Sequence, residues 1–219
     1  MITQKTAIAS SKPIIALTFD DGPNTSTTLE VLEILKKYNI PASFFVVGNN
    51  INDETTAVIR KAFEMGCEID NHSQTHSNMK ELSPNDILTE IKYTSDKVEK
   101  IIGVPTKFFR PPYIAVNQTM FDTINLPFIN GYGANDWEDS VDAKTRYKVI
   151  AEKAKDGGII LLHDAAGNHQ TVEAIDMIIP ELLKQGYQFV TVSQLFEIKG
   201  IEPVESYIYT NVLQTEAWG

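Results

Sequence analysis

The sequence is poor in cysteine, in basic residues and in long apolar runs, and each shortage excludes a class of protein. Cys67 is the only cysteine among 219 residues, so the chain cannot form an internal disulfide or a thiolate metal cluster. We interpret Cys67 as a small buried apolar residue. No apolar run approaches the roughly 20 residues that span a bilayer, which predicts that the chain has no membrane span.

Acidic residues outnumber basic ones. The chain has 29 Asp and Glu against 19 Lys and Arg, a formal net charge of -10 at pH 7, and its basic residues form no cluster. Nucleic acids and anionic membranes bind positive surfaces, so we expect neither as a partner, whereas a neutral substrate is compatible with this charge. Residues 1–11 lack the apolar centre of a signal peptide. If the protein is secreted, its leader lies outside this sequence.

Apolar segments of strand length alternate with segments of helical periodicity along most of the chain. Such alternation indicates an α/β fold with a parallel sheet and helices outside it, and about seven units favour one barrel-like domain over two domains. We predict strands at residues 14–19, 42–47, 67–69, 107–110, 127–133, 158–162 and 189–192, and helices at residues 29–38, 51–65, 84–102, 117–126, 141–156, 171–185 and 193–198.

The periodic pattern ends near residue 199. No low-complexity segment or break in composition interrupts the preceding residues, which we assign to one domain, 1–199. Beyond it, aromatic residues are scattered among polar ones without periodicity. We therefore predict that residues 200–219 are either a strap packed on the domain or the remnant of a linker to another module.

Two adjacent carboxylates, Asp20 and Asp21, stand between an apolar run at residues 14–19 and the dipeptide Gly22-Pro23. The run is typical of a strand buried on both faces, and α/β folds place their chemistry at the carboxyl ends of such strands. The alternative is an ordinary turn, because Asp-Gly and Gly-Pro are common turn signals.

His72 and His76 are four residues apart, so on a helical turn both imidazoles would point the same way. Two nitrogens one turn apart can converge on a metal ion, and Asp21 would complete a two-histidine, one-carboxylate set with open positions for water. A pair of surface or capping histidines is the alternative. Such a set suits a divalent ion, with zinc preferred and cobalt, nickel, iron or manganese as alternatives.

Other polar residues also follow predicted strands. Arg110 precedes two prolines that fix the backbone direction, and a rigid arginine there can pair with a carboxylate. A surface arginine before a turn is the alternative. His163 directly follows the apolar strand at 158–162, where scarce solvent can tune the pKa of an imidazole. Asp136 offers a carboxylate beside the flat ring of Trp137.

These residues fall in five short motifs that resemble, in the same order, those of the polysaccharide deacetylases, carbohydrate esterase family four. The segments around residues 134–137 and 158–164 are most similar to members described as acetyl-xylan esterases, several of which also accept chitooligosaccharides. The five motifs are Thr18-Phe19-Asp20-Asp21-Gly22-Pro23, His72-x-x-x-His76, Arg110-Pro111-Pro112-Tyr113, Asp136-Trp137 and Leu161-x-His163.

The resemblance implies a fold and a cofactor. The fold would be a single distorted (β/α) barrel with about seven strands, in which residues 1–199 form the catalytic domain. One divalent metal ion would be held by Asp21, His72 and His76. The protein would act outside the cell or at the cell surface, and we expect it to be a monomer.

The resemblance also implies the roles of individual residues. Asp20 would be the general base and His163 the general acid. Arg110 would orient Asp20, and Asp136 would pair with His163 and keep it protonated.

Three further residues would contact the substrate, an acetylated polysaccharide or oligosaccharide. Tyr113 would offer its backbone N–H to the oxyanion, and Leu161 and Trp137 would line a pocket for the acetyl methyl group. The implied reaction is hydrolysis of acetyl groups on a β-1,4-linked polysaccharide, either O-acetyl groups of xylan or N-acetyl groups of chitooligosaccharides.

Two positions depart from the family pattern. Gly133 stands where members commonly have an aspartate three residues before the Asp-Trp pair, and Asp70 stands where many have glycine. Three alternatives also stay open: a peptidoglycan N-acetylglucosamine deacetylase, a catalytically inactive carbohydrate-binding relative, and an iron oxygenase with the same metal ligands. An oxygenase would leave Asp20, Arg110 and His163 without a task.

Overall fold

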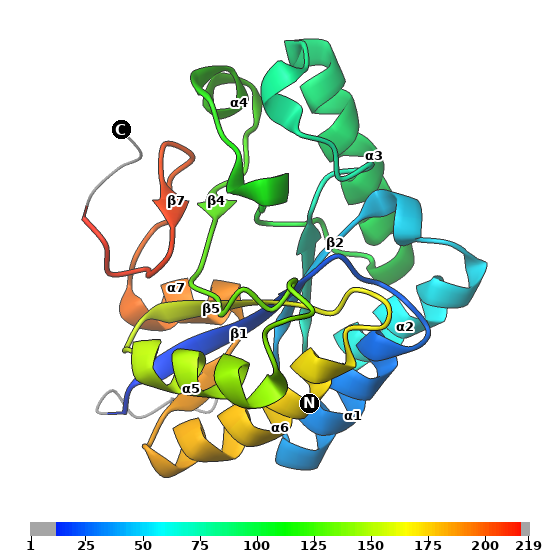
Figure 1. Ribbon diagram of the computed structural model, residues 1–219. Coiled ribbons are helices and arrows are strands. Elements are labelled where there is room, and N and C mark those ends of the chain that lie inside the picture. The colour runs from blue at the N-terminus through cyan, green and yellow to red at the C-terminus, as the bar shows by residue number, and fades with distance from the viewer. Residues whose placement is uncertain (1–11, 216–219) are drawn as a thin grey trace, which may run out of the picture.

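A five-stranded parallel sheet lies at the centre of the computed structural model, which describes residues 12–215 (Figure 1). Its strands follow the order β3-β2-β1-β5, and β6 pairs with β1 as well. Strands β4 and β7 form a separate parallel pair. The strands are β1 (Ile14–Asp20), β2 (Ser43–Val46), β3 (Glu68–Asn71), β4 (Phe128–Ile129), β5 (Gly158–His163), β6 (Gln188–Val190) and β7 (Ile208–Tyr209).

Helices surround the sheet and pack on one another in the order α5, α6, α1, α2, α3. Figure 1 shows α5, α6 and α1 side by side along one face of the central strands. Within residues 12–215 no helix has the length and apolar character needed to cross a membrane. The helices are α1 (Thr27–Tyr38), α2 (Asp53–Glu64), α3 (Pro84–Ile102), α4 (Gln118–Thr123), α5 (Ala143–Lys153), α6 (His169–Lys184) and α7 (Val192–Lys199), with short 3-10 turns η1 (Gly48–Asn50), η2 (Met79–Glu81) and η3 (Pro112–Ile114).

The helices confirm the predicted ones, with small shifts at their ends. Ser83 accepts a hydrogen bond from the backbone N–H of Asp86 and begins α3, as a serine N-cap should. Asn39 ends α1 and Gly103 ends α3, both in the left-handed conformation at φ 52° and 76°, which satisfies the last carbonyl groups of each helix.

Strand β1 is buried along its whole length and separates two apolar clusters. Leu17 and Phe19 pack in the larger cluster with the helices, whereas Ala16 packs in a second cluster on the opposite face. Because side chains alternate across a strand, Thr18 and Asp20 lie on the same face as Ala16. This alternation points both polar side chains away from the larger cluster.

Two predicted strands are shorter than the sequence indicates. Residues 107–110 contribute only isolated bridges from Phe109 to Asn71 and Phe128, and residues 127–133 contribute β4 and a bridge at Tyr132. Two prolines directly follow the first segment and Pro127 begins the second, and a proline lacks the N–H that a ladder needs. The described pairings therefore form a five-stranded and a two-stranded sheet joined by isolated bridges; a closed barrel is not confirmed.

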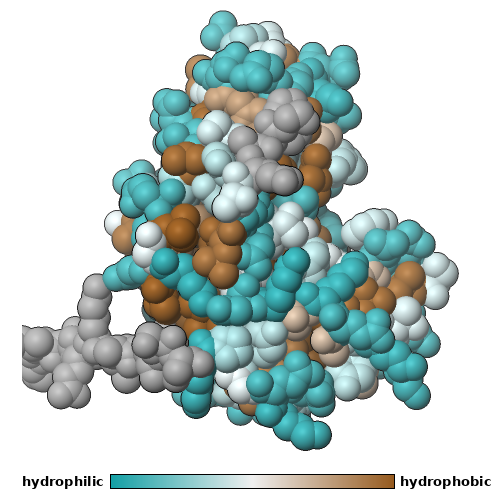
Figure 2. All heavy atoms as spheres, turned by 90° about the vertical axis from the view of Figure 1, so that its left-hand side faces the viewer, coloured by the Kyte–Doolittle hydropathy of each residue, from teal (hydrophilic) through white to brown (hydrophobic). Residues whose placement is uncertain are grey.

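Residues 201–215 pack against the domain. Strand β7 pairs with β4, and Tyr209 and Val212 are buried in the second apolar cluster. Figure 2 shows the side on which β7 and α7 lie, where apolar side chains form small groups separated by hydrophilic ones. The boundary at residue 199 stays a prediction, and Trp218 lies outside the described residues.

Candidate active site

The polar residues that follow β1, β3 and β5 meet at one edge of the sheet. The pairing of β1 with β5 places Asp20 directly beside His163, and β3 ends immediately before His72. Together they border a cavity of about 560 Å³. Predicted site residues that line this cavity are Asp20, Asp21, His72, His76, Tyr113, Trp137, Leu161 and His163.

Asp21, His72 and His76 form a set that could hold a metal ion. The Oδ1 atom of Asp21 lies 3.2 Å from Nε2 of His76 and 3.6 Å from Nε2 of His72, and one ligand atom from each residue lies within 4.8 Å of the others. Nδ1 of His72 donates to the backbone carbonyl of Arg110 at 2.7 Å. That bond leaves the lone pair of Nε2 facing Asp21, the tautomer that a metal ligand needs, so the set fits a divalent ion.

The predicted helical turn from His72 to His76 is wrong. The segment is a loop in which Ser73 and His76 have positive φ angles of 65° and 58°. Asp21 is also left-handed, at φ 75°. Left-handed non-glycine residues cluster at functional sites because their surroundings must hold them there. Here they bring both Nε2 atoms to Asp21 without a helix.

Glu90, on α3, holds this loop and had no signal in the sequence. Its Oε2 atom accepts the backbone N–H groups of Gln74 and Thr75 at 2.9 and 2.8 Å. Asn71 supports the same loop, since its Oδ1 accepts the N–H of Ser73 at 2.8 Å. The position of His76 therefore depends on a carboxylate from a distant helix.

Asp20 is paired with Arg110, and both side chains are buried. Nη1 of Arg110 donates to Oδ1 of Asp20 at 2.5 Å, and Nη2 donates to Oγ1 of Thr18 at 2.8 Å. The guanidinium also lies 4.1 Å from the ring centroid of Phe45. Because Arg110 spans two residues on one face of β1, it fixes the orientation of the Asp20 carboxylate.

Asp136 and His163 form a second pair, in which Asp136 is buried and His163 is partly buried. Nδ1 of His163 donates to Oδ1 of Asp136 at 2.8 Å, and the backbone N–H of His163 donates to Oδ2 at 2.7 Å. Burial lowers the pKa of His163, but the hydrogen bond and negative charge of Asp136 outweigh it and raise the pKa to about 9. The imidazole is therefore mainly protonated at neutral pH.

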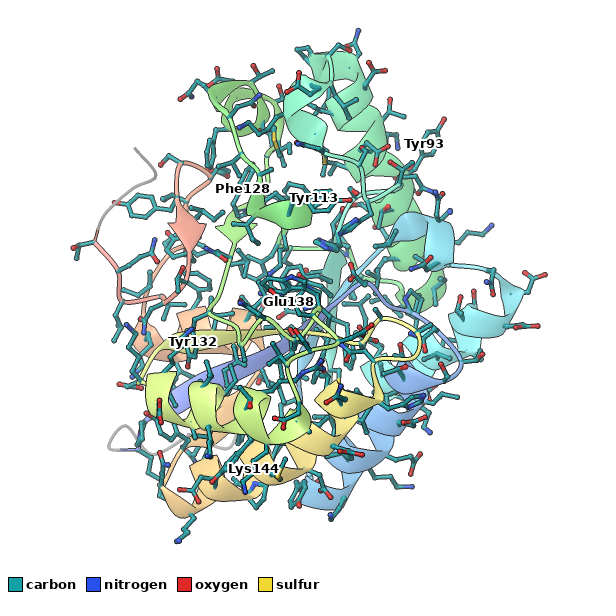
Figure 3. The ribbon with its side chains drawn as sticks, viewed as in Figure 1. Tyr93, Tyr113, Phe128, Tyr132, Glu138 and Lys144 are labelled. Atoms are coloured by element: carbon teal, nitrogen blue, oxygen red, sulfur yellow. The ribbon has the colours of Figure 1, made fainter. Side chains whose placement is uncertain are left out.

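Tyr113 and Trp137 border the cavity and are exposed at 69% and 59%. The Tyr113 ring lies 4.8 Å from that of His76, and the Trp137 ring lies 5.5 Å from that of His163. In Figure 3, Tyr113 lies on the short turn between α3 and α4. Two open aromatic rings beside the cavity can pack on a sugar, while buried Leu161 forms part of its apolar wall.

Asp164 follows His163 and is hydrogen-bonded to the backbone of Asp20 and to the side chain of Thr28. Its buried Oδ2 accepts the hydroxyl of Thr28, and its backbone N–H donates to the carbonyl of Asp20 at 3.0 Å. Burial, together with the charges of Asp20 and Asp21, raises the pKa of Asp164 to about 7. Sequence reasoning gave Asp164 no role.

Asp70, the second departure from the family pattern, is a buried structural residue. Its Oδ1 accepts the backbone N–H groups of Lys107 and Phe108 at 2.9 and 3.1 Å, and burial raises its pKa well above the ordinary value. The side chain thereby ties residues 105–108 to β3, next to the segment that carries Arg110.

The other departure, Gly133, lies against β5. A Cβ atom at this position would come within 2.8 Å of the backbone carbonyl oxygen of Leu161. The backbone of β5 cannot move away cheaply because β5 is paired with β1. The close approach explains why glycine stands here.

Gly133→Asp and Gly133→Ala are both expected to lower the free energy of unfolding, by about 1–3 kcal/mol, which is typical of overpacking. Urea unfolding followed by circular dichroism measures the change. The alanine variant isolates the steric effect from the charge. Unchanged unfolding of Gly133→Ala would show that the contact with Leu161 does not restrict this position.

Comparison with known proteins identifies the family of this chain. The sequence profile of a family described as "Polysaccharide deacetylase" matches residues 7–126, more than half of the chain. The chain belongs to the polysaccharide deacetylases. Peptidoglycan deacetylases are among the more distant relatives of this polysaccharide deacetylase.

Three relatives are especially similar. A bifunctional xylanase/deacetylase of Pseudobutyrivibrio xylanivorans is 50% identical over 92% of this chain and 34% of its own length. The Xyl-CE4 domain of a multidomain xylanase from the hindgut metagenome of Trinervitermes trinervoides superposes with a TM-score of 0.90 at 50% identity, covering 92% of this chain and 98% of that one. A family 4 acetyl xylan esterase from Clostridium thermocellum, in complex with a cobalt ion, gives a TM-score of 0.89 at 43% identity, covering 92% and 100%.

The chain spans only part of several curated relatives, between 34% and 42% of their length.

Proposed function

We propose that this chain hydrolyses acetyl groups on a β-1,4-linked polysaccharide, the substrate being O-acetylated xylan, N-acetylated chitooligosaccharides or both. One observation carries the proposal: Asp20, His163 and the set formed by Asp21, His72 and His76 border the same cavity of about 560 Å³. The similarity to a xylanase/deacetylase and to an acetyl xylan esterase supports xylan as the first substrate to test.

Asp21, His72 and His76 would hold the divalent ion in this proposal. Such an ion, when bound, would lower the pKa of water to about 7 and polarise a carbonyl group. We propose zinc, with cobalt, nickel, iron or manganese as alternatives, because two imidazoles and a carboxylate suit each of them. The cobalt ion in the structure of a relative supports a divalent ion of this kind.

Asp20 would act as the general base. Arg110 donates a hydrogen bond to Oδ1 of Asp20, so Oδ2 is left to accept the proton of the attacking water. That oxygen lies 3.7 Å from Nε2 of His72, beside the proposed metal ligands. General base catalysis of this kind contributes about 10²- to 10⁴-fold.

His163 would act as the general acid. Asp136 binds its Nδ1, so Nε2 is the nitrogen left to donate a proton to the departing sugar oxygen or nitrogen. An unprotonated sugar alkoxide is a poor leaving group, so this proton matters most for ester substrates.

The remaining residues would hold the acetyl group. In this proposal the backbone N–H of Tyr113 donates to the oxyanion, a contact of a type worth about 3 kcal/mol. Trp137 and Leu161 enclose the methyl group. A single copy of the chain supplies every group, so we propose a monomer that acts outside the cell or at its surface, where such polymers occur.

Acetate release from a panel of substrates tests the proposal. The panel contains acetylated xylan, chitooligosaccharides and peptidoglycan, each incubated with metal-loaded protein. Release from xylan or chitooligosaccharides supports the proposal, and release from peptidoglycan alone identifies the alternative substrate. No release from any of them, with substrate binding retained, would indicate an inactive carbohydrate-binding relative, and oxygen consumption would indicate an oxygenase.

Asp136→Asn is expected to shift the basic limb of the pH profile to lower pH. His163 must be protonated to act as the acid, and its pKa of about 9 keeps it so until the pH rises through that value. Without the Asp136 charge the pKa of His163 should fall by about 1–3 units, so the imidazole loses its proton at lower pH. The pH dependence of kcat/KM for acetate release measures the shift.

The matched control for this variant is Asp139→Asn, which removes an exposed carboxylate from the same loop. Its basic limb should coincide with that of the unaltered protein. A basic limb that does not move in Asp136→Asn would show that another group provides the acid.

A further inference from the structure

Behind Asp136 lies Arg146, a buried arginine on α5 that is only 1% exposed. Its Nε donates to the carbonyl of Val141 at 2.7 Å, and its Nη2 donates to the carbonyl of Glu138 at 3.1 Å. Glu138 lies on the loop that crosses in front of the central strands in Figure 3. These bonds anchor the guanidinium to the loop that also carries Asp136.

The Nη1 atom of Arg146 donates to Oγ1 of Thr171 at 2.8 Å. Thr171 lies in the first turn of α6 and is fully buried. A guanidinium has donors but no acceptor, so the threonine hydroxyl must accept from Arg146. Its own hydrogen is therefore free to point elsewhere.

That hydrogen is directed at Asp136. Oγ1 of Thr171 donates to Oδ2 of Asp136 at 2.7 Å, and the same oxygen accepts the backbone N–H of His163. Oδ1 of Asp136 is left for Nδ1 of His163. The order of donation is thus fixed from Arg146 through Thr171 to Asp136, and both bonds of the Thr171 hydroxyl are buried.

We propose that Thr171, oriented by Arg146, is a positioning residue for the pair of Asp136 and His163. Its hydroxyl prevents the Asp136 carboxylate from rotating and keeps Oδ1 aimed at the imidazole. The inference rests on the proposed function, since it assigns His163 as the acid. Asp136 is only 1% exposed, and a buried acceptor that loses its donor is costly to leave unsatisfied.

Other charged groups also act on His163, and Thr171 changes none of them. Asp20 and Asp21 face it from the end of β1 and, like Asp136, raise its pKa. A change at Thr171 therefore affects His163 only through the geometry and charge of Asp136. The pH profile and the imidazole titration report this effect, whereas a general loss of packing would lower stability without moving either.

The test compares Thr171→Val, which keeps the shape and removes the hydroxyl, with Thr171→Ser, which keeps the hydroxyl. In Thr171→Val the value of kcat should fall about 10- to 100-fold, as expected for loss of a hydrogen bond to a charged group, and the basic limb should move to lower pH. KM and metal content should not change. Thr171→Ser should restore most of the rate and the position of the limb.

A second measurement is independent of activity. Nuclear magnetic resonance of the ring nitrogens in the zinc-loaded protein follows the titration of His163, assigned with His163→Gln. We expect a lower pKa of His163 in Thr171→Val than in Thr171→Ser. Equal titration curves, or equal rates in the two variants, would overturn the inference. If the unaltered protein releases no acetate, the proposed function fails, and the titration still decides the role of Thr171.

Discussion

Asp20→Asn protein is expected to keep its metal ion and to release acetate about 10²- to 10⁴-fold more slowly than the unaltered protein. The amide can still accept the Arg110 hydrogen bond through its oxygen, but it cannot take a proton from water. Asp21, His72 and His76 are untouched by the change, so the metal set stays complete. Steady-state kinetics and metal analysis of the same sample measure both effects.

The change also alters the surroundings of Arg110, whose side chain is 0% exposed. Removing the charge of its partner leaves a buried cation unpaired, and breaking a buried pair costs up to about 3–5 kcal/mol. The stability of the variant should therefore be measured by thermal unfolding alongside the kinetics. Asp176→Asn is the matched control, because Asp176 is a surface carboxylate that pairs with Lys37.

Two outcomes would contradict the assignment of Asp20. Turnover close to that of the unaltered protein would show that another group removes the proton. Loss of the metal in a folded Asp20→Asn protein would place Asp20 among the metal ligands and remove the division of roles between the two adjacent aspartates.

His72→Ala protein is expected to lose its metal ion and, with it, acetate release. His72 is one of three proposed ligands, and its Nδ1 bond to the Arg110 carbonyl fixes the imidazole in place. Changes to groups that merely orient a ligand lower metal affinity about 10- to 100-fold, so removing the ligand itself should have a larger effect. Calorimetric titration with zinc measures the affinity of the protein for the ion.

His169→Ala is the matched control for His72→Ala. His169 is an exposed imidazole whose Nδ1 contacts Glu30 at 3.0 Å, away from the metal set. This variant should bind zinc and release acetate like the unaltered protein. Equal zinc affinity in His72→Ala and His169→Ala would rule out the proposed metal site.

The strand ends could be predicted because composition changes abruptly there. The apolar runs before Asp20 and His163 are long enough for a buried strand, and parallel strands expose their carboxyl ends at one edge. The pairing of β1 with β5 brings the two residues together at that edge. The tasks of individual residues came instead from the resemblance in five motifs.

The loop that carries His76 could not be predicted from spacing. Its shape depends on left-handed residues at Ser73 and His76 and on hydrogen bonds to Glu90, and none of these produces a periodic pattern. The spacing of four suggested a helix, whereas distant contacts determine a loop. Both shapes can bring the imidazoles together.

The hydrogen bonds that connect Arg146 and Thr171 to Asp136 could not be predicted from the sequence either. Arg146 and Thr171 belong to helices whose sequences have an ordinary amphipathic pattern. The polar groups of the two residues meet only when α5 packs on α6. The bridges at Phe109 likewise join it to residues far along the chain, Asn71 and Phe128. Contacts between distant segments leave no local signal.

Acetate release by metal-free protein, before and after addition of a divalent ion, tests the central claim most directly. The protein is stripped with a chelator, dialysed, and assayed on acetylated xylan and chitooligosaccharides during titration with zinc or cobalt. We predict no release without metal and full release once about one ion is bound per chain, as a single Asp21, His72 and His76 set requires. Equal release with and without metal, or none from either substrate when metal is bound, would contradict the account.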